Sequence, residues 1–149
     1  MSLHIISHKN FKVDKPLSKK LITAFDLICI EERLSSCSVN LKILNDSEIK
    51  NLNRKFRNKD KPTNVLSFTN EDISKQVTNN LGDIAISYEY VECESKEQNK
   101  KFDNHFIHMF IHGIYHILGF DHESDSMADD MEDKEILLLK KLNIKNPYK

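Results

Sequence analysis

The sequence predicts an α+β fold in which a roughly four-stranded mixed sheet is layered against helices. Two observations predict this class: strand and helix patterns alternate along the earlier part of the chain, and helical patterns alone follow. A third observation places the core, because one of the later helices is apolar nearly all round and is expected to be buried. With 149 residues, 39% hydrophobic and 30% charged, the chain is predicted to form one domain over residues 1–149.

Four segments have the pattern of strands, because apolar residues alternate along them or form a short run with polar flanks. They are Leu3–Ser7, Val39–Ile43, Val65–Thr69 and Asp83–Tyr88. Two amphipathic helices are predicted between them, starting at Asp14-Lys15-Pro16 and at Asp46. Their apolar faces are Leu17, Leu21, Ala24, Phe25 and Ile28 in the first helix, and Ile49, Leu52 and Phe56 in the second.

Three helical patterns follow the last strand. Glu89–Lys100 is predicted to be a polar helix, and Phe102–Leu118 is the apolar helix expected at the centre of the core. The last helix is predicted to begin at a Ser124 or Ser126 cap. Its apolar stripe is Met127, Met131, Leu138 and Leu142. The polar segment Asn70–Asn80 has little to bury and is predicted to be a mobile loop beside the functional site.

Three histidines near the C-terminus, His112, His116 and His122, are spaced to hold one metal ion. Two imidazoles four residues apart lie on one face of a helix, about 6 Å apart along its axis. Gly119 is a predicted helix stop, since it can adopt a left-handed conformation and let the chain turn His122 back. Three neutral imidazoles with an open fourth position are typical of a catalytic zinc, and they also accept nickel, cobalt or copper.

Two neighbouring side chains are candidates for supporting this metal. His108 lies one turn before His112, but His108, His112 and His116 would span about 12 Å of helix axis, too far for one ion. We therefore predict that His108 supports the site or packs in the core. Asp121 lies next to His122 and is a candidate to orient an imidazole, although a turn residue bonded to its own backbone is the alternative.

The segment His112–His122, HGIYHILGFDH, resembles the signature of the YbeY family of bacterial ribosomal RNA maturation factors. Two further stretches, Phe56–Phe68 and Leu81–Ile86, are similar to that family, as is the closing Asn146-Pro147-Tyr148. The histidine spacing is shared with metzincin proteases, which carry a glutamate directly after the first histidine as general base. Here that position is Gly113, so the resemblance favours the YbeY family.

The resemblance implies a single-strand-specific endoribonuclease with a zincin-like site, in which the three histidines bind one zinc ion. It implies a role in maturing the 3′ end of small-subunit ribosomal RNA and in ribosome quality control. The implied partners are single-stranded RNA, the small-subunit ribosomal RNA precursor, and the small ribosomal subunit with its assembly factors. Many members have aspartate where this chain has Asn64 and proline where it has Thr69, a departure that alters the local electrostatics.

A basic segment from Arg54 to Lys61 offers contacts for a phosphate backbone, with five cationic residues against Asp60 alone. Arg57 is the candidate catalytic cation, because a guanidinium can donate two parallel hydrogen bonds to a phosphate. The resemblance places an arginine at this position too. Lys59 and Lys61 are candidates for RNA binding. The alternative is a solvated helix end, in which these cations only offset the helix dipole.

The remaining composition narrows the class of protein. The net charge of −1 argues against a protein that coats nucleic acid. The eight acids between Asp121 and Glu135 are predicted to favour a helix start rather than to bind substrate. Cys29, Cys37 and Cys93 form no C-x-x-C pair, which argues against disulfides and a cysteine zinc site. The N-terminus has no signal-peptide pattern and no segment could span a bilayer, so we expect a cytoplasmic protein without membrane contact.

Three functions fit these observations. The first is a zinc-dependent endoribonuclease that uses His112, His116, His122 and Arg57. The second is a metal-stabilised ribosome assembly factor that binds the immature subunit without chemistry. The third, a metallopeptidase, is disfavoured because Gly113 cannot act as a base. For the first function the sequence leaves open whether water or the 2′-hydroxyl of the RNA attacks.

Overall fold

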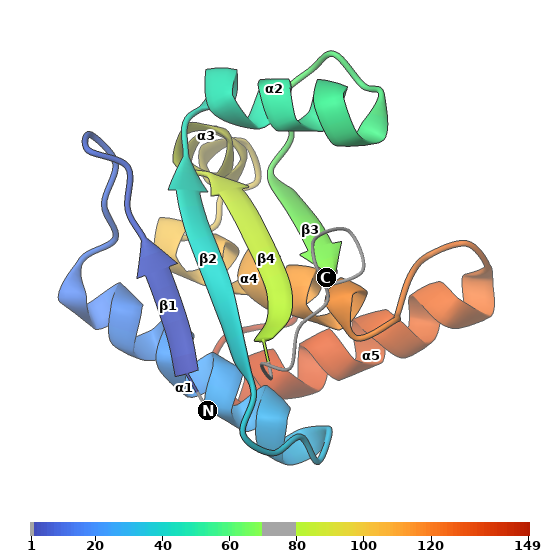
Figure 1. Ribbon diagram of the computed structural model, residues 1–149. Coiled ribbons are helices and arrows are strands. Elements are labelled where there is room, and N and C mark those ends of the chain that lie inside the picture. The colour runs from blue at the N-terminus through green and yellow to red at the C-terminus, as the bar shows by residue number, and fades with distance from the viewer. Residues whose placement is uncertain (1, 70–79) are drawn as a thin grey trace.

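The computed structural model describes residues 2–69 and 80–149 and has the predicted α+β architecture with a four-stranded mixed sheet (Figure 1). The strands are β1 (Ser2–Ile6), β2 (Ser38–Leu44), β3 (Val65–Thr69) and β4 (Asn80–Ser87). The helices are α1 (Lys15–Glu31), α2 (Asp46–Arg57), α3 (Tyr88–Glu97), α4 (Phe102–Ile117) and α5 (Asp125–Lys141). The predicted strands and helices are thus confirmed, with small shifts at their ends. Of the predicted loop Asn70–Asn80, residues 70–79 lie outside the described residues, and Asn80 begins β4.

The sheet has the strand order β1-β2-β4-β3. β1 and β4 both run parallel to β2, whereas β3 runs antiparallel to β4. Parallel neighbours need a crossover connection, and α1 provides the one between β1 and β2. β3 is an edge strand that pairs with β4 on one side, and its other side borders the candidate site.

The larger core lies between one face of the sheet and α1, α4 and α5, and α2 lies at one end of the sheet (Figure 1). The period-two alternation of β4 divides its side chains between the faces. Ile84 and Ile86 point into the larger core, whereas Ala85 packs with Ile49 of α2 and Leu66 of β3 in a smaller one. α4 crosses the larger core beneath β3 and β4, and most of its residues are buried, as the sequence predicted. A metal-binding pair on this helix is therefore held on a rigid support.

The predicted apolar face of α2 is partly wrong. Ile49 is buried, but Phe56 is 47% exposed and packs edge-on against the ring of Phe68. The position between them on this face is taken by Asn53, which is buried and donates a hydrogen bond from Nδ2 to the carbonyl of Lys61 at 2.9 Å. Asn53 thereby ties the end of α2 to the turn that leads into β3.

α5 begins at a Ser124 cap, whose hydroxyl accepts the backbone N–H of Met127 at 3.1 Å. Met131 and Leu138 are buried as predicted, but Met127 is exposed because it lies in the first turn of the helix. Glu135 is fully buried on the same stripe. The prediction that the acidic run favours the helix start is therefore wrong for Glu135, which lies beyond the first turn of α5.

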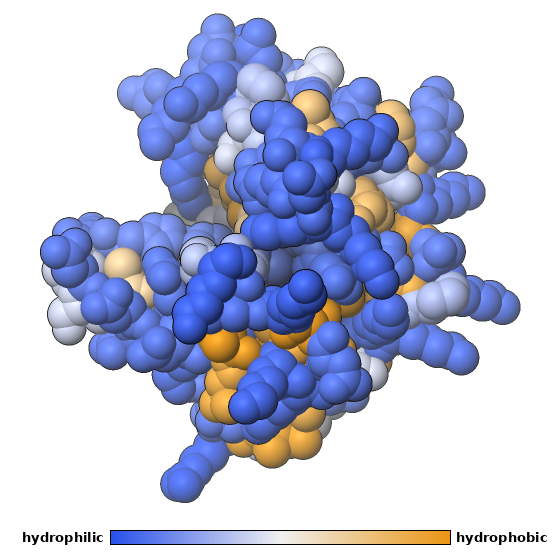
Figure 2. Space-filling view, turned by 180° about the vertical axis from the view of Figure 1, so that it is seen from behind, coloured by the Kyte–Doolittle hydropathy of each residue, from blue (hydrophilic) through white to orange (hydrophobic). Residues whose placement is uncertain are grey.

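The surface seen from behind is mainly hydrophilic, with hydrophobic side chains gathered in its lower part (Figure 2). Within the described residues, no helix combines the length and the apolarity that a membrane span requires. The thiols of Cys29 and Cys37 are buried in the larger core with their Sγ atoms 3.1 Å apart, which joins the end of α1 to the start of β2.

Candidate metal centre

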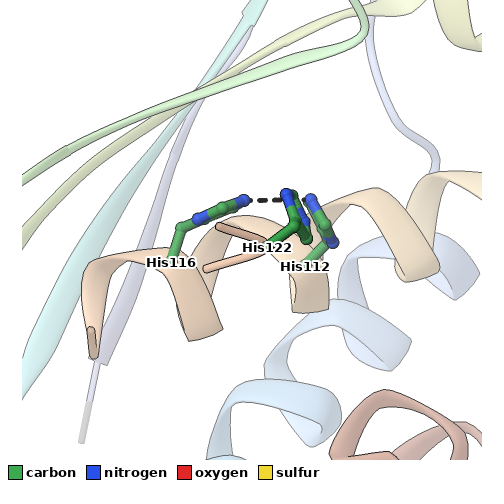
Figure 3. Close-up of side chains that lie close together, drawn as sticks. All are labelled: His112, His116 and His122. Carbon is green, nitrogen blue, oxygen red and sulfur yellow. Dashed lines mark hydrogen bonds between the residues drawn. The ribbon is translucent and has the colours of Figure 1, made fainter. Parts of the chain in front are cut away.

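The side chains of His112 and His116 project from the same face of α4, and His122 approaches them from the segment after the helix (Figure 3). One ring nitrogen of each histidine lies within 4.8 Å of the others. The Nε2 atoms of His112 and His116 are 3.1 Å apart. Two ligands of a tetrahedral ion with bonds of about 2.1 Å would lie about 3.4 Å apart, so the helical pair already has the required spacing.

The turn after α4 positions the third histidine. Gly119 has φ +105°, and its N–H donates to the carbonyl of His116 at 3.1 Å. The N–H of Phe120 donates to the carbonyl of Tyr115 at 3.0 Å, and the two rings pack edge to face. These bonds form a Schellman motif, in which the left-handed residue is usually glycine. The helix therefore ends as Gly119 predicted, and the reversed chain brings the ring of His122 to 5.0 Å from that of His112.

Behind His112 lies a buried carboxylate. Nδ1 of His112 donates to Oε2 of Glu135 at 2.7 Å, which leaves the lone pair of Nε2 facing the other histidines. Oε1 of Glu135 accepts from Nε2 of His108 at 2.7 Å and from the hydroxyl of Tyr148 at 2.5 Å. Burial would raise the pKa of Glu135, but the hydrogen bonds from His108 and His112 outweigh it and lower the pKa to about 2. Glu135 is thus an ionised acceptor that fixes the orientation of His112.

The electrostatics around His116 favour its neutral imidazole, the form that binds metal. Burial, together with the proximity of His112 and His122, lowers the pKa of His116 to about 4. A neutral ring with its Nε2 facing a second imidazole is a good donor for zinc or a similar ion. The donor set and its geometry therefore fit a single metal ion.

The histidine pair borders a cavity of about 380 Å³ beside the edge strand β3. Arg57, at the end of α2, lines the same cavity as His112 and His116. Its guanidinium donates to the carbonyl of Ser67 at 2.7 Å and lies over the ring of Phe68, 4.9 Å from the centroid. The Arg57 guanidinium is thus held against β3, on the wall of the same cavity that His112 and His116 line. In the part of the chain that the structure describes, neither Lys59 nor Lys61 lines this cavity.

Comparisons with known proteins agree with this geometry. The family model described as endoribonuclease YbeY matches residues 4–143. Endoribonuclease YbeY of Francisella tularensis subsp. novicida is 44% identical over 137 residues, which cover 89% of this chain and 85% of that protein. The protein of F. tularensis subsp. tularensis strain FSC 198 is also 44% identical, over 89% of this chain and 82% of its own.

This chain belongs to the YbeY family. A solution structure of TM1509 from Thermotoga maritima is similar in fold, with a TM-score of 0.63 and 26% identity over 95% of this chain and 91% of that one. The resemblance inferred from the histidine segment is therefore confirmed.

In this YbeY chain Gly113 stands where metzincins have the glutamate, and side chains of β3 and β4 occupy the space beside it. A Cβ added to Gly113 would lie 3.1 Å from Cγ2 of Ile84, 3.1 Å from Oγ of Ser67 and 3.3 Å from Cγ2 of Val65. Oγ of Ser67 also donates to the carbonyl of Gly113 at 2.9 Å. Gly113 therefore lets β3 and β4 approach α4 closely, and a glutamate side chain has no room there.

Replacing Gly113 by glutamate is expected to lower the free energy of unfolding by about 3 kcal/mol or more, because the side chain would push β3 and β4 off α4 and would bury a carboxylate. Gly113→Ala is the matched control, since a helix-propensity gain of about 1 kcal/mol offsets its smaller clash. Urea unfolding of both variants measures the difference. A Gly113→Glu protein as stable as the wild type would show that β3 can move away from α4.

Three further residues that the sequence analysis singled out, Asp121, His108 and Asn64, lie near the histidine triad or its cavity and bond to other groups. Oδ1 of Asp121 accepts the backbone N–H of Glu123 at 2.9 Å, so Asp121 makes the turn contact that is the alternative to orienting an imidazole. His108 is 5% exposed and bonds to Glu135, so it contacts the group that supports His112. Asn64 donates from Nδ2 to Oε1 of Glu94 at 3.1 Å, a bond that an ionised aspartate at this position could not make.

Sequence reasoning missed Glu135 and Tyr148 as parts of this site. Glu135 follows Met131 by four residues and precedes Leu138 by three, so it occupies the apolar stripe of α5. A charged residue in such a stripe is a signal that it has a buried partner. Tyr148 has no comparable signal, because its contact with Glu135 depends on how the C-terminal segment folds back.

Proposed function

We propose that this chain is a zinc-dependent endoribonuclease that cleaves single-stranded RNA. The observation that carries the proposal is the convergence of His112, His116 and His122 beside a cavity whose wall also holds Arg57. Metal ligands and a guanidinium on one cavity wall suit a phosphodiester, whose transition state gathers negative charge. Membership of the endoribonuclease YbeY family supports RNA as the substrate.

The residues of the cavity have separate tasks in this reaction. When bound, zinc supplies Lewis acidity toward a phosphoryl oxygen and acidifies water. Arg57 binds the phosphate: its guanidinium, which has five N–H donors, is held by bonds to the carbonyls of Phe56 and Ser67 and would donate to phosphate oxygens from the cavity wall. In the described residues, the cavity wall contains no carboxylate. Glu135 therefore acts by orienting His112 and does not take a proton from the attacking group.

The physiological task that we propose is maturation of the 3′ end of small-subunit ribosomal RNA, with a part in ribosome quality control in the cytoplasm. Its partners would be the precursor RNA and the small ribosomal subunit with its assembly factors. Lys59 and Lys61 are exposed in the turn after α2 and would extend the positive charge beyond the cavity along the RNA backbone. Family membership supports this proposal.

Replacing Arg57 by alanine tests the proposed chemistry. We expect cleavage of a single-stranded RNA to fall about 10–100-fold, the worth of a charge-assisted hydrogen bond, while the metal content stays that of the wild type. Arg57→Lys should lose less cleavage activity than Arg57→Ala, because lysine keeps the positive charge although it lacks the planar pair of donors. Arg33→Ala is the matched control, since Arg33 is an exposed arginine after α1 that lies outside the basic segment and is not among the described residues that line the cavity.

The assay compares initial cleavage rates for the zinc-loaded proteins, with and without EDTA, on single- and double-stranded RNA. Cleavage that persists in EDTA, or that is equal for the wild type and Arg57→Ala, would contradict the proposal. Metal binding without any RNA cleavage would instead favour the non-catalytic assembly factor.

A further inference from the structure

A second cavity, of about 390 Å³, adjoins the first along α4. The two share Asn64 and His112, but the second extends toward the start of α4, past His108 to His105, and under the C-terminal segment. Its volume is within the range of small-ligand sites. A strand of RNA whose phosphate lies beside His112 would therefore have a cavity of nucleotide size on either side of that phosphate.

A fixed carboxylate lines this second cavity. Oε1 of Glu94 accepts from Nε2 of His105 at 2.9 Å and from Nδ2 of Asn64 at 3.1 Å. His105 is 3% exposed, so the pair is anchored in the core, whereas the side chain of Glu94 is 23% exposed. The bonds from His105 and Asn64 hold the side chain of Glu94 in place. Within the described residues its other oxygen, Oε2, accepts no hydrogen bond. Glu94 is thus a pre-oriented acceptor with one oxygen available to a ligand.

The rest of the lining suits a flat, polar, aromatic ligand. Met109, Pro147 and the ring of Tyr148 provide apolar surface, and Gln98 and Lys100 add an amide and a cation. Unstacked bases of single-stranded RNA are recognised in this way, by contact with aromatic side chains and by hydrogen bonds to their edges. The catalytic proposal uses neither Glu94 nor Gln98.

We infer that the cavity between α3, α4 and the C-terminal segment binds the nucleobase next to the scissile phosphate, and that Glu94 selects bases with an exocyclic amino group. This inference rests on the proposed function for the position of the phosphate. Adenine, cytosine and guanine each offer an amino N–H to a carboxylate, whereas uracil presents carbonyl oxygens beside its single N–H. The site therefore disfavours uridine.

The test measures the affinity of the zinc-loaded full chain for AMP, CMP, GMP and UMP. Binding is monitored by NMR of the backbone amides and of the Tyr148 ring. AMP, CMP and GMP are expected to bind about tenfold more tightly than UMP and to shift the signals of Glu94, Gln98 and Tyr148. In Glu94→Gln the amide can donate to carbonyl oxygens, so the four affinities should come within about twofold. Glu92→Gln, an exposed position on the same helix, is the control and should keep the wild-type preference.

Equal affinities for the four nucleotides in the wild type would overturn the inference, as would signal shifts confined to the first cavity. The wild-type measurement decides this even if Glu94→Gln fails to fold. Selective nucleotide binding by a chain that cleaves no RNA would support the base site and contradict the proposed function. Cleavage of RNA by a chain that binds all four nucleotides equally would support the proposed function and contradict the base site.

Discussion

A His116→Ala protein is expected to lose its metal and its RNA cleavage together. His116 provides one of three ring nitrogens that lie within 4.8 Å of one another, and its removal leaves His112 and His122 as a two-ligand site. Catalytic zinc sites use three protein ligands, and two bind the ion far more weakly. We therefore expect zinc content to fall from about one ion per chain to a small fraction of that, and cleavage to fall to the background.

His4→Ala is the matched control, because His4 is an exposed histidine on β1, away from the triad. Zinc is measured by elemental analysis after dialysis, and folding by circular dichroism, because His116 is half-buried and its loss costs some packing. A folded His116→Ala protein that keeps a full equivalent of zinc and cleaves RNA at the wild-type rate would remove His116 from the site.

Replacing Glu135 by alanine is expected to damage both stability and metal affinity. The carboxylate is fully buried and accepts from His108, His112 and Tyr148. Removing it leaves three donors without their acceptor, and breaking a buried charged network of this kind costs about 3–5 kcal/mol in the free energy of unfolding. His112 also loses the bond that fixes its ring, which lowers metal affinity by about 10–100-fold at comparable sites.

Two further variants separate these effects. Tyr148→Phe removes one bond to Glu135 and leaves His112 bonded, so it should cost only about 1 kcal/mol and leave zinc affinity nearly unchanged. Asp133→Asn, exposed on the same helix, should change neither quantity. The readouts are urea unfolding and competition for zinc with a chelator. If Glu135→Ala bound zinc as tightly as the wild type, the carboxylate would not position His112.

The parts of the site that depend on local sequence were predictable. Helical spacing places His112 and His116 on one face, and Gly119 marks the turn that returns His122, because both effects act within a few residues. Period-two alternation likewise located β3 and the buried part of β4.

The parts that depend on packing between distant segments were not predictable from local patterns. Glu135 reaches His112 across two packed helices. Ser67 and Ile84 close over Gly113 only because β3 and β4 lie on α4. Glu94 joins Asn64 to His105 in the same way, although no spacing in the sequence connects these residues.

The most direct test is X-ray absorption spectroscopy at the zinc edge, together with anomalous diffraction from crystals of the zinc-loaded chain. We predict one ion per chain, with nitrogen from His112, His116 and His122 at about 2.0–2.1 Å and a fourth position taken by solvent. An ion bound elsewhere, or one enclosed by four protein side chains, would contradict the proposed catalytic centre.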